Sequence, residues 1–198
     1  MVPCELCKAI EDANTTSNEF WNTKLYENKS FIVLPSIGPL KEGQVIIASK
    51  LHTLNLLSMP AESKKDILPI ITLAIKILGN NILFAEHGTF LNQNGGSCIE
   101  HTHLHVFPSY EHYFDILDDV LPILNSSFEL VDLEKPTTVD FPYILTFDLR
   151  NNSRIYEAYN AHSQMIRKAI CIKEGNEFGD WKKDKRIDLI NRTISVWS

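Results

Sequence analysis

Residues 95–108 read Gly-Gly-Ser-Cys-Ile-Glu-His-Thr-His-Leu-His-Val-Phe-Pro and contain three of the chain's seven histidines, at every second position. The residues between and after the histidines are mostly β-branched, apolar or aromatic, which favours a strand. Because side chains alternate faces along a strand, His101, His103 and His105 share one face. We expect an interior strand from His101 to Phe107, ended by Pro108.

Three imidazoles on one face of a strand are costly to bury without partners. Neutral imidazole near pH 7 is a nucleophile, a proton carrier and a metal ligand. The pattern therefore indicates a reactive site, and the alternative is a surface strand that is merely rich in histidine.

The composition limits the class of protein. The chain has 198 residues, with 44% hydrophobic and 22% charged residues, as in an ordinary globular domain or a domain with a large extension. Its net charge of −6 argues against broad binding to extended nucleic acid, which needs a basic face. No apolar run reaches about 18 residues, so we expect no membrane span. The N-terminus lacks the basic and apolar regions of a signal peptide, so we expect a cytoplasmic protein with reduced cysteines.

The first half of the chain reads as a hairpin, a helix and two strands. Strands are expected at 31–35 and 44–49, around the turn 38–43. A helix is expected after Pro60, with an apolar stripe up to residue 78, a stop at Gly79 and a possible kink at Pro69. A strand at 82–86 then leads towards the histidines. These elements predict an α+β fold with one antiparallel sheet and the helix packed on it.

The second half is expected to alternate helices and strands. Helices are predicted at 110–124, 156–172 and from a turn at 179–183 to Trp197, with strands at 128–133 and 143–149.

A Cys-x-x-C motif, Cys4 and Cys7, lies near the N-terminus. The spacing suits two thiolates on one metal ion, but a redox pair or two unrelated buried thiols remain alternatives. Structural zinc would need two more ligands.

His-x-His-x-His followed by apolar residues resembles the histidine triad (HIT) family of nucleotide hydrolases and transferases. The lead-in Gly-Ser-Cys-Ile-Glu is similar to the family's Gly-Gln-x-x-x, with Ser97 in place of Gln. The resemblance implies that His103 attacks the α-phosphate of a nucleotide and forms a covalent nucleotidyl-histidine. It implies that His105 binds a phosphate oxygen or the scissile bridge, and a packing role is the alternative. The segment with Gly43, Lys50 and His52 also resembles the family's hairpin.

Zinc-bearing members of the HIT superfamily use a C-x-x-C motif, a histidine after the hairpin and the first triad histidine. The corresponding residues here are Cys4, Cys7, His52 and His101. Together they would make the closed Cys₂His₂ shell typical of structural zinc. Without metal, His52 would be a hydrogen-bonding neighbour.

Further substrate contacts are expected around the triad. Gly96, Ser97 and Cys98 are candidates to bind a phosphate. Glu86, in a Glu-His-Gly segment where many HIT proteins have Asn-x-Gly, would orient a histidine or bind a ribose, unless it is only the end of a surface strand.

The C-terminal segments Gln164-x-x-Arg167 and Trp181-Lys-Lys resemble the extension of certain long HIT-like hydrolases. Arg167 and Lys182 would then bind a distal phosphate, and exposed surface charge is the alternative for each. We expect a HIT-like core at residues 1–110 and an extension at 111–198 packed on the same core.

The resemblance implies a nucleotide hydrolase acting on dinucleoside polyphosphates or nucleoside phosphoramidates. The alternatives are a nucleotidyltransferase or phosphorylase with the same first half-reaction, a non-catalytic nucleotide-binding protein, and a zinc-binding interaction module. The expected partner is a small nucleotide, and a homodimer is implied by the resemblance alone.

Overall fold

The computed structural model describes residues 4–13, 15, 19–90, 96–108, 110, 114–125, 129, 132–133, 135, 139–150, 152–177 and 179–198, so Gly95 lies outside the described residues. The strands are β1 (Tyr26–Glu27), β2 (Phe31–Pro35), β3 (Val45–Ser49), β4 (Ile82–Gly88), β5 (His103–Pro108), β6 (Ile123–Asn125), β7 (Tyr143–Asp148) and β8 (Ser153–Glu157). The helices are α1 (Glu5–Asp12), α2 (Ala61–Lys65), α3 (Ile67–Leu78), α4 (Phe114–Asp118), α5 (Met165–Lys173) and α6 (Ile187–Trp197), with a short 3₁₀ helix, η1 (Phe20–Asn22).

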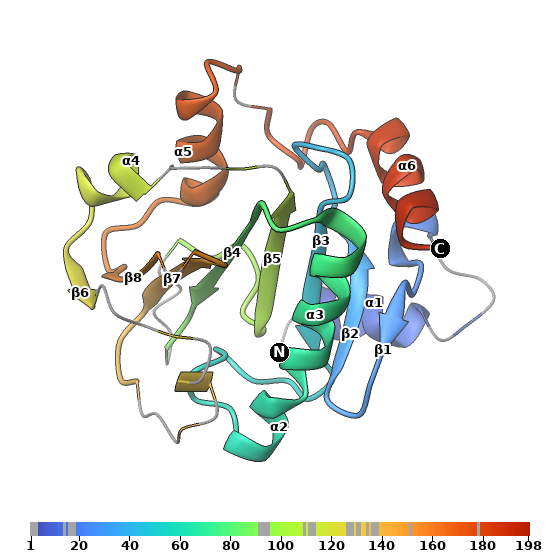
Figure 1. Ribbon diagram of the computed structural model, residues 1–198, viewed down its shortest axis with the longest axis horizontal. Coiled ribbons are helices and arrows are strands. Elements are labelled where there is room, and N and C mark those ends of the chain that lie inside the picture. Colours follow the sequence, from blue (N-terminus) through green and yellow to red (C-terminus); the bar gives the residue numbers. More distant parts are fainter. Residues whose placement is uncertain are drawn as a thin grey trace.

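The strands form one antiparallel sheet in the order β1-β2-β3-β5-β4-β7-β8-β6 (Figure 1). This architecture confirms the predicted α+β fold and the interior position of the histidine strand. Strand β5 begins at His103 and not at His101, because the amide of Thr102 bonds to the carbonyl of Thr53 in the loop after β3. The expected hairpin is also present as β2 and β3.

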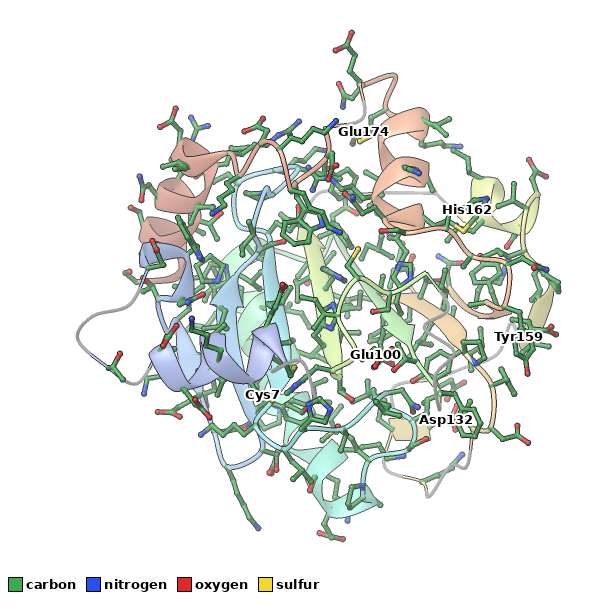
Figure 2. All side chains as sticks on the ribbon, turned by 180° about the vertical axis from the view of Figure 1, so that it is seen from behind. Cys7, Glu100, Asp132, Tyr159, His162 and Glu174 are labelled. Carbon is green, nitrogen blue, oxygen red and sulfur yellow. The ribbon has the colours of Figure 1, made fainter. Side chains whose placement is uncertain are left out.

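The two faces of the sheet are covered by different helices. Leu104 and Val106 of β5 join the core cluster that contains the apolar side of α3. On the opposite face, α1 packs on β2 and β3, while α4 and α5 pack on β4, β7 and β8. Figure 1 shows α3 in front of the sheet, and Figure 2, seen from behind, shows α1 and α5 on the other face. The side chains of His103 and His105 therefore point to the face between α1 and α5.

The helix predicted after Pro60 is divided at Asp66 into α2 and α3. Pro69 lies in the first turn of α3, where its missing amide hydrogen costs little, and the break between α2 and α3 lies three residues before it. Gly79 ends α3 with a φ of 83°, as expected for a glycine stop.

Two predicted helices in the second half are wrong in extent. In the described part of segment 110–124, only Phe114–Asp118 is helical, and β6 follows it. Segment 156–172 begins as the end of β8, because Tyr156 pairs with Ile144 in the sheet, and α5 starts only at Met165. The final helix and the strand at 143–149 are present, whereas the strand predicted at 128–133 falls mostly on residues that are not described.

Strands β7, β8 and β6 extend the sheet beyond β4. The division of the chain at residue 110 stays a prediction. Across the described residues, none of the helices has the length and apolar character needed to span a membrane.

Candidate active site

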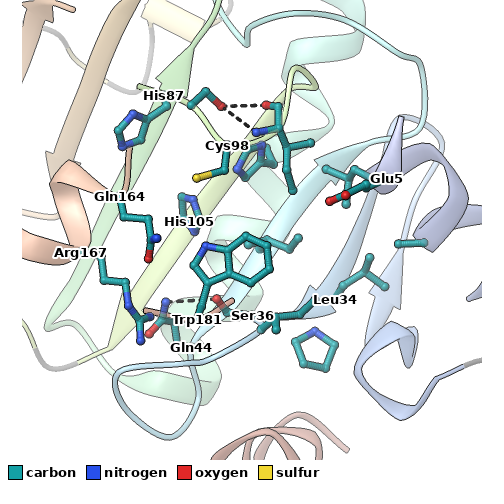
Figure 3. Close-up of a pocket in the computed structure, with 18 of the residues that line it drawn as sticks. Glu5, Leu34, Ser36, Gln44, His87, Cys98, His105, Gln164, Arg167 and Trp181 are labelled. Atoms are coloured by element: carbon teal, nitrogen blue, oxygen red, sulfur yellow. Dashed lines mark hydrogen bonds between the residues drawn. The ribbon is translucent and has the colours of Figure 1, made fainter. Parts of the chain in front are cut away.

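A cavity of about 180 Å³ lies over β5, on the face of the sheet between α1 and α5. His103 and His105 line it, with β2 and β3 on one side and α5 on the other (Figure 3). One end is mostly apolar and includes Leu6, Trp21, Leu34 and Ile46. The other end carries polar side chains from α5 and the segment just before it, Arg167 and Gln164, beside Trp181. The pocket thus offers an apolar wall, two imidazoles and a polar end.

His103 is held with one ring nitrogen fixed. Its Nδ1 lies 2.7 Å from the carbonyl oxygen of His101. Because a carbonyl only accepts, Nδ1 must carry the proton and Nε2 keeps its lone pair. The side chain is 6% exposed, and burial lowers its pKa below the ordinary value. The arrangement presents a neutral imidazole in the tautomer that a nucleophile needs.

His105 is the next pocket residue along β5. Its ring centroid lies 4.8 Å from that of His103 and 5.6 Å from that of Phe107. Burial, followed by the charges of His103 and His87, lowers its pKa well below the ordinary value. Its Nδ1 is buried and has no hydrogen-bond partner among the described residues, so it can bond to a ligand.

The segment Gly96–Cys98, which the sequence predicts to bind a phosphate, forms part of the pocket wall. Gly96 has a φ of 79°, and a Cβ there would lie 2.7 Å from the carbonyl oxygen of His162, so the close approach of the two segments requires glycine. The hydroxyl of Ser97 donates to the carbonyl of Ile99, and the thiol of Cys98 lies 2.8 Å from the hydroxyl of Ser163. The Ser97 hydrogen is therefore used inside its own turn.

Cys4, Cys7, His52 and His101 come together at the N-terminal end of α1, as the sequence predicts. Their ligand atoms all lie within 4.8 Å of one another. The Nδ1 of His101 is 3.5 Å from the Cys4 sulfur and 3.4 Å from the Cys7 sulfur, and the Nδ1 of His52 is 3.3 Å from the Cys7 sulfur. Nitrogen and sulfur ligands in a tetrahedral zinc shell are about 3.6 Å apart. The donor set therefore fits zinc in both chemistry and spacing.

The ring of His101 is oriented by the backbone. Its Nε2 lies 2.7 Å from the carbonyl oxygen of Ser49 and must donate to it, so the Nδ1 lone pair faces the two sulfurs. Cys4 caps α1 by accepting from the amide of Cys7 at 3.5 Å. Burial and the neighbouring Cys4 raise the pKa of Cys7 to about 11, and a divalent cation would favour its thiolate.

Two expected substrate contacts are not where the sequence placed them. Glu86 is fully buried on the α3 side of the sheet, where it accepts from the amide of Leu56 at 2.7 Å and from the hydroxyl of Tyr143 at 2.5 Å. Strand alternation turns it away from the pocket. Lys182 is exposed on a turn and is not a lining residue, because its ammonium remains in solvent 5.8 Å from the Trp181 ring centroid.

The residue that sequence reasoning missed beside Glu86 is His87. It is 7% exposed and lines the pocket. The pairing of Ala85 with His105 places His87 next to His103 on the same face of the sheet. Strand alternation predicts that Glu86 and His87 face opposite sides of the sheet. The sequence did not show which of the two sides carries the pocket.

The comparisons with known proteins show the family of the chain. A curated protein of Candida albicans, the adenosine 5'-monophosphoramidase HNT1, is 30% identical over 111 residues, which cover 53% of this chain and 69% of that protein. This chain belongs to the histidine triad family. No family model matches it.

Solved HIT structures are similar to part of the chain. A hypothetical histidine triad nucleotide-binding protein from Sulfolobus tokodaii is 19% identical with a TM-score of 0.42, covering 55% of this chain and 70% of that one. A zinc-bound histidine triad family protein from Mycobacterium smegmatis is 21% identical with a TM-score of 0.40, covering 55% and 76%. At this level of similarity, the chemistry of the HIT site must be argued from its own residues.

Proposed function

We propose that the chain is a HIT-type nucleotide hydrolase that cleaves nucleoside phosphoramidates at the α-phosphate. The observation that carries the proposal is the hydrogen bond from His103 Nδ1 to the His101 carbonyl. It leaves Nε2 as the nucleophilic nitrogen in a pocket that also contains His105. The name of the Candida albicans relative favours phosphoramidates over dinucleoside polyphosphates.

The pocket suggests how the substrate lies. The apolar end, with Trp21, Leu34 and Ile46, suits the flat face of a base. The α-phosphate then lies over His103 and His105, beside the segment Gly96–Cys98, and the leaving group extends towards Arg167. His105 Nδ1, unpartnered among the described residues, is the nearest group to bond a phosphate oxygen or the bridging nitrogen.

The reaction has two balanced steps. His103 Nε2 forms a bond to phosphorus as the P–N bond to the leaving amine breaks, and the amine nitrogen takes up one proton from the solvent as it departs. Water then attacks phosphorus, the bond to His103 breaks, and the nucleoside monophosphate leaves as the water gives up a proton. The His101 carbonyl holds the His103 ring in one orientation through both steps.

Cys4, Cys7, His52 and His101 would hold one zinc ion. The ion would tie α1 and the loop after β3 to the residue before β5, so its role is structural. With all four ligands bound, the tetrahedral shell would be closed and would leave no coordination position for a substrate.

The proposal is tested with adenosine phosphoramidates as substrates and release of adenosine monophosphate as the measurement. His103→Ala should abolish turnover while the dissociation constant of the substrate stays within a few-fold of wild type, because the lost group acts in the chemical step. His162→Ala, at an exposed histidine outside the pocket lining, is the matched control and should keep full activity. A nucleotidyl adduct trapped on wild type and missing from His103→Ala would support the covalent route, and full activity of His103→Ala would exclude it.

A further inference from the structure

The guanidinium of Arg167 is fixed in place with part of its donor capacity unused. The side chain is 8% exposed. Its Nε donates to the carbonyl of Gly179 at 2.8 Å, and its Nη1 donates to the carbonyl of Gly38. Its Nη2 is buried and has no partner among the described residues, although the residue lines the pocket. Two N–H bonds of a preorganised group therefore remain for a ligand.

Gln164, beside Arg167, offers a hydrogen-bond acceptor where Arg167 offers donors. Its Nε2 donates to a carboxylate oxygen of Asp180 at 2.9 Å. Because a carboxylate only accepts, the amide nitrogen must face Asp180, and Oε1 is left as an acceptor. That oxygen is also buried without a partner in the described part of the chain.

The two groups act on the same region of the pocket. Gln164 is the N-cap of α5 and Arg167 lies in the first turn, three residues on, so the side chains are neighbours on one side of the helix. Figure 3 shows both entering the pocket from α5, with His105 beyond them. Leaving a buried polar group unpaired costs about 1–3 kcal/mol, so two neighbouring unpaired groups at a pocket wall indicate that a bound group completes them.

The chemistry of that bound group follows from the pair. It must accept from Arg167 Nη2 and donate to Gln164 Oε1. Water does both, and within a substrate the smallest group that does both and can replace a water is a hydroxyl. An ionised phosphate offers no hydrogen to Gln164 Oε1, and an apolar chain satisfies neither atom.

We propose that Gln164 and Arg167 form a leaving-group subsite that binds a hydroxyl on the amine side of the substrate. This inference rests on the proposed function, because it takes the group beyond the α-phosphate to be the leaving amine. It names the substrate class more narrowly, as nucleoside phosphoramidates of hydroxyl-bearing amines. It also gives residues of the C-terminal part of the chain a direct role in specificity.

The test uses matched pairs of adenosine phosphoramidates. Each pair carries an alkylamine that ends in a hydroxyl or, at the same length, in a methyl group, with chains of two to five carbons. In wild type, kcat/KM should favour the hydroxyl member by about 10-fold at the best length, as expected for one buried hydrogen-bonding group. In Gln164→Met, which removes the acceptor, the two members should converge to within about twofold. His162→Ala is the control and should keep the wild-type preference.

A second variant at the same position keeps the test valid if Gln164→Met does not fold. Gln164 has a φ of 62°, which asparagine tolerates better than most residues. Gln164→Asn withdraws the amide by one methylene, so it should also reduce the preference for the hydroxyl member.

The outcomes separate this proposal from the hydrolase proposal. If no compound is cleaved, dissociation constants of the same pairs are read from the emission of Trp181, which lines the pocket. A hydroxyl preference in binding without cleavage would support the subsite and exclude the hydrolase. Cleavage or binding at equal strength for both members at every length would overturn the subsite. A compound ending in a carboxylate that outperforms the hydroxyl member would overturn it too, because Arg167 would then be an anion site on its own.

Discussion

Glu86→Gln should remove a pH dependence from the stability of the fold. Burial raises the pKa of Glu86 from 4.5 to about 8, against hydrogen bonds from Tyr143 and Leu56 that lower it. The two bonds favour the carboxylate, but they leave a fully buried charge, so the desolvation cost dominates. A carboxyl whose pKa is raised on folding stabilises the protein below pH 4.5, and this contribution is lost as the pH rises towards 8.

The size of the effect follows from linkage. Between the two pKa values, the folded state holds one more proton than the unfolded state, so the free energy of unfolding falls by about 1.4 kcal/mol per pH unit. From pH 5.5 to 7.5, the loss is about 2–3 kcal/mol. Glutamine keeps an oxygen to accept from the Leu56 amide. Its NH₂, like the hydroxyl of the neutral acid, donates to the Tyr143 oxygen in place of the bond that Tyr143 donates to the carboxylate. The variant should therefore gain about 2–3 kcal/mol relative to wild type across this range.

The measurement is urea unfolding of both proteins at several pH values, with matched metal content. Taking the difference between variant and wild type removes the histidine titrations that the two proteins share. Glu19→Gln, at an exposed position, is the control and should give a difference that does not change with pH. A flat difference for Glu86→Gln as well would show that the buried carboxyl stays ionised, and the reasoning from desolvation would fail.

Three further outcomes are expected. Cys7→Ser should lower the zinc content from close to one ion per chain and reduce the melting temperature, as measured by metal analysis and calorimetry, since structural zinc contributes directly to folding. Gly88→Ala should destabilise the fold by about 1–3 kcal/mol in urea unfolding, because a Cβ there would lie 2.4 Å from the buried ring of Tyr143; an unchanged midpoint would contradict this packing. His105→Ala should lower kcat by about 10²–10³ without abolishing it, as for the loss of one preorganised donor, and complete loss of turnover would contradict that role.

The local pattern was enough for the first half of the fold. The alternation within residues 101–107 fits the period of a strand, and the apolar stripe up to residue 78 fits the period of a helix. The structure contains both elements, as β5 and α3. The second half failed where pairing across the sheet decided the outcome. Tyr156 lies in β8 because it pairs with Ile144 of the preceding strand β7, and this hairpin pairing overrides the helical pattern of segment 156–172.

The candidate site divides in the same way. The four metal-site residues were predictable from the resemblance to zinc-bearing HIT proteins, and the structure brings them together. The sequence could not show which of Glu86 and His87 faces the pocket, because nothing in it indicates which side of β4 faces α3. Trp21 and Trp181 reach the pocket from segments whose sequences carry no periodic signal.

The residue that joins the metal group to the pocket is His101, which uses its side chain and its backbone for different tasks. The ring bonds to the Ser49 carbonyl through Nε2 and presents Nδ1 to the two sulfurs. The backbone carbonyl of the same residue fixes Nδ1 of His103. Because both groups belong to one residue, a backbone shift at His101 moves the ring away from the sulfurs and also moves the acceptor that sets the His103 tautomer. The alternating spacing of the histidines thus puts consecutive imidazoles into a metal group and a reactive pocket and keeps the two mechanically linked.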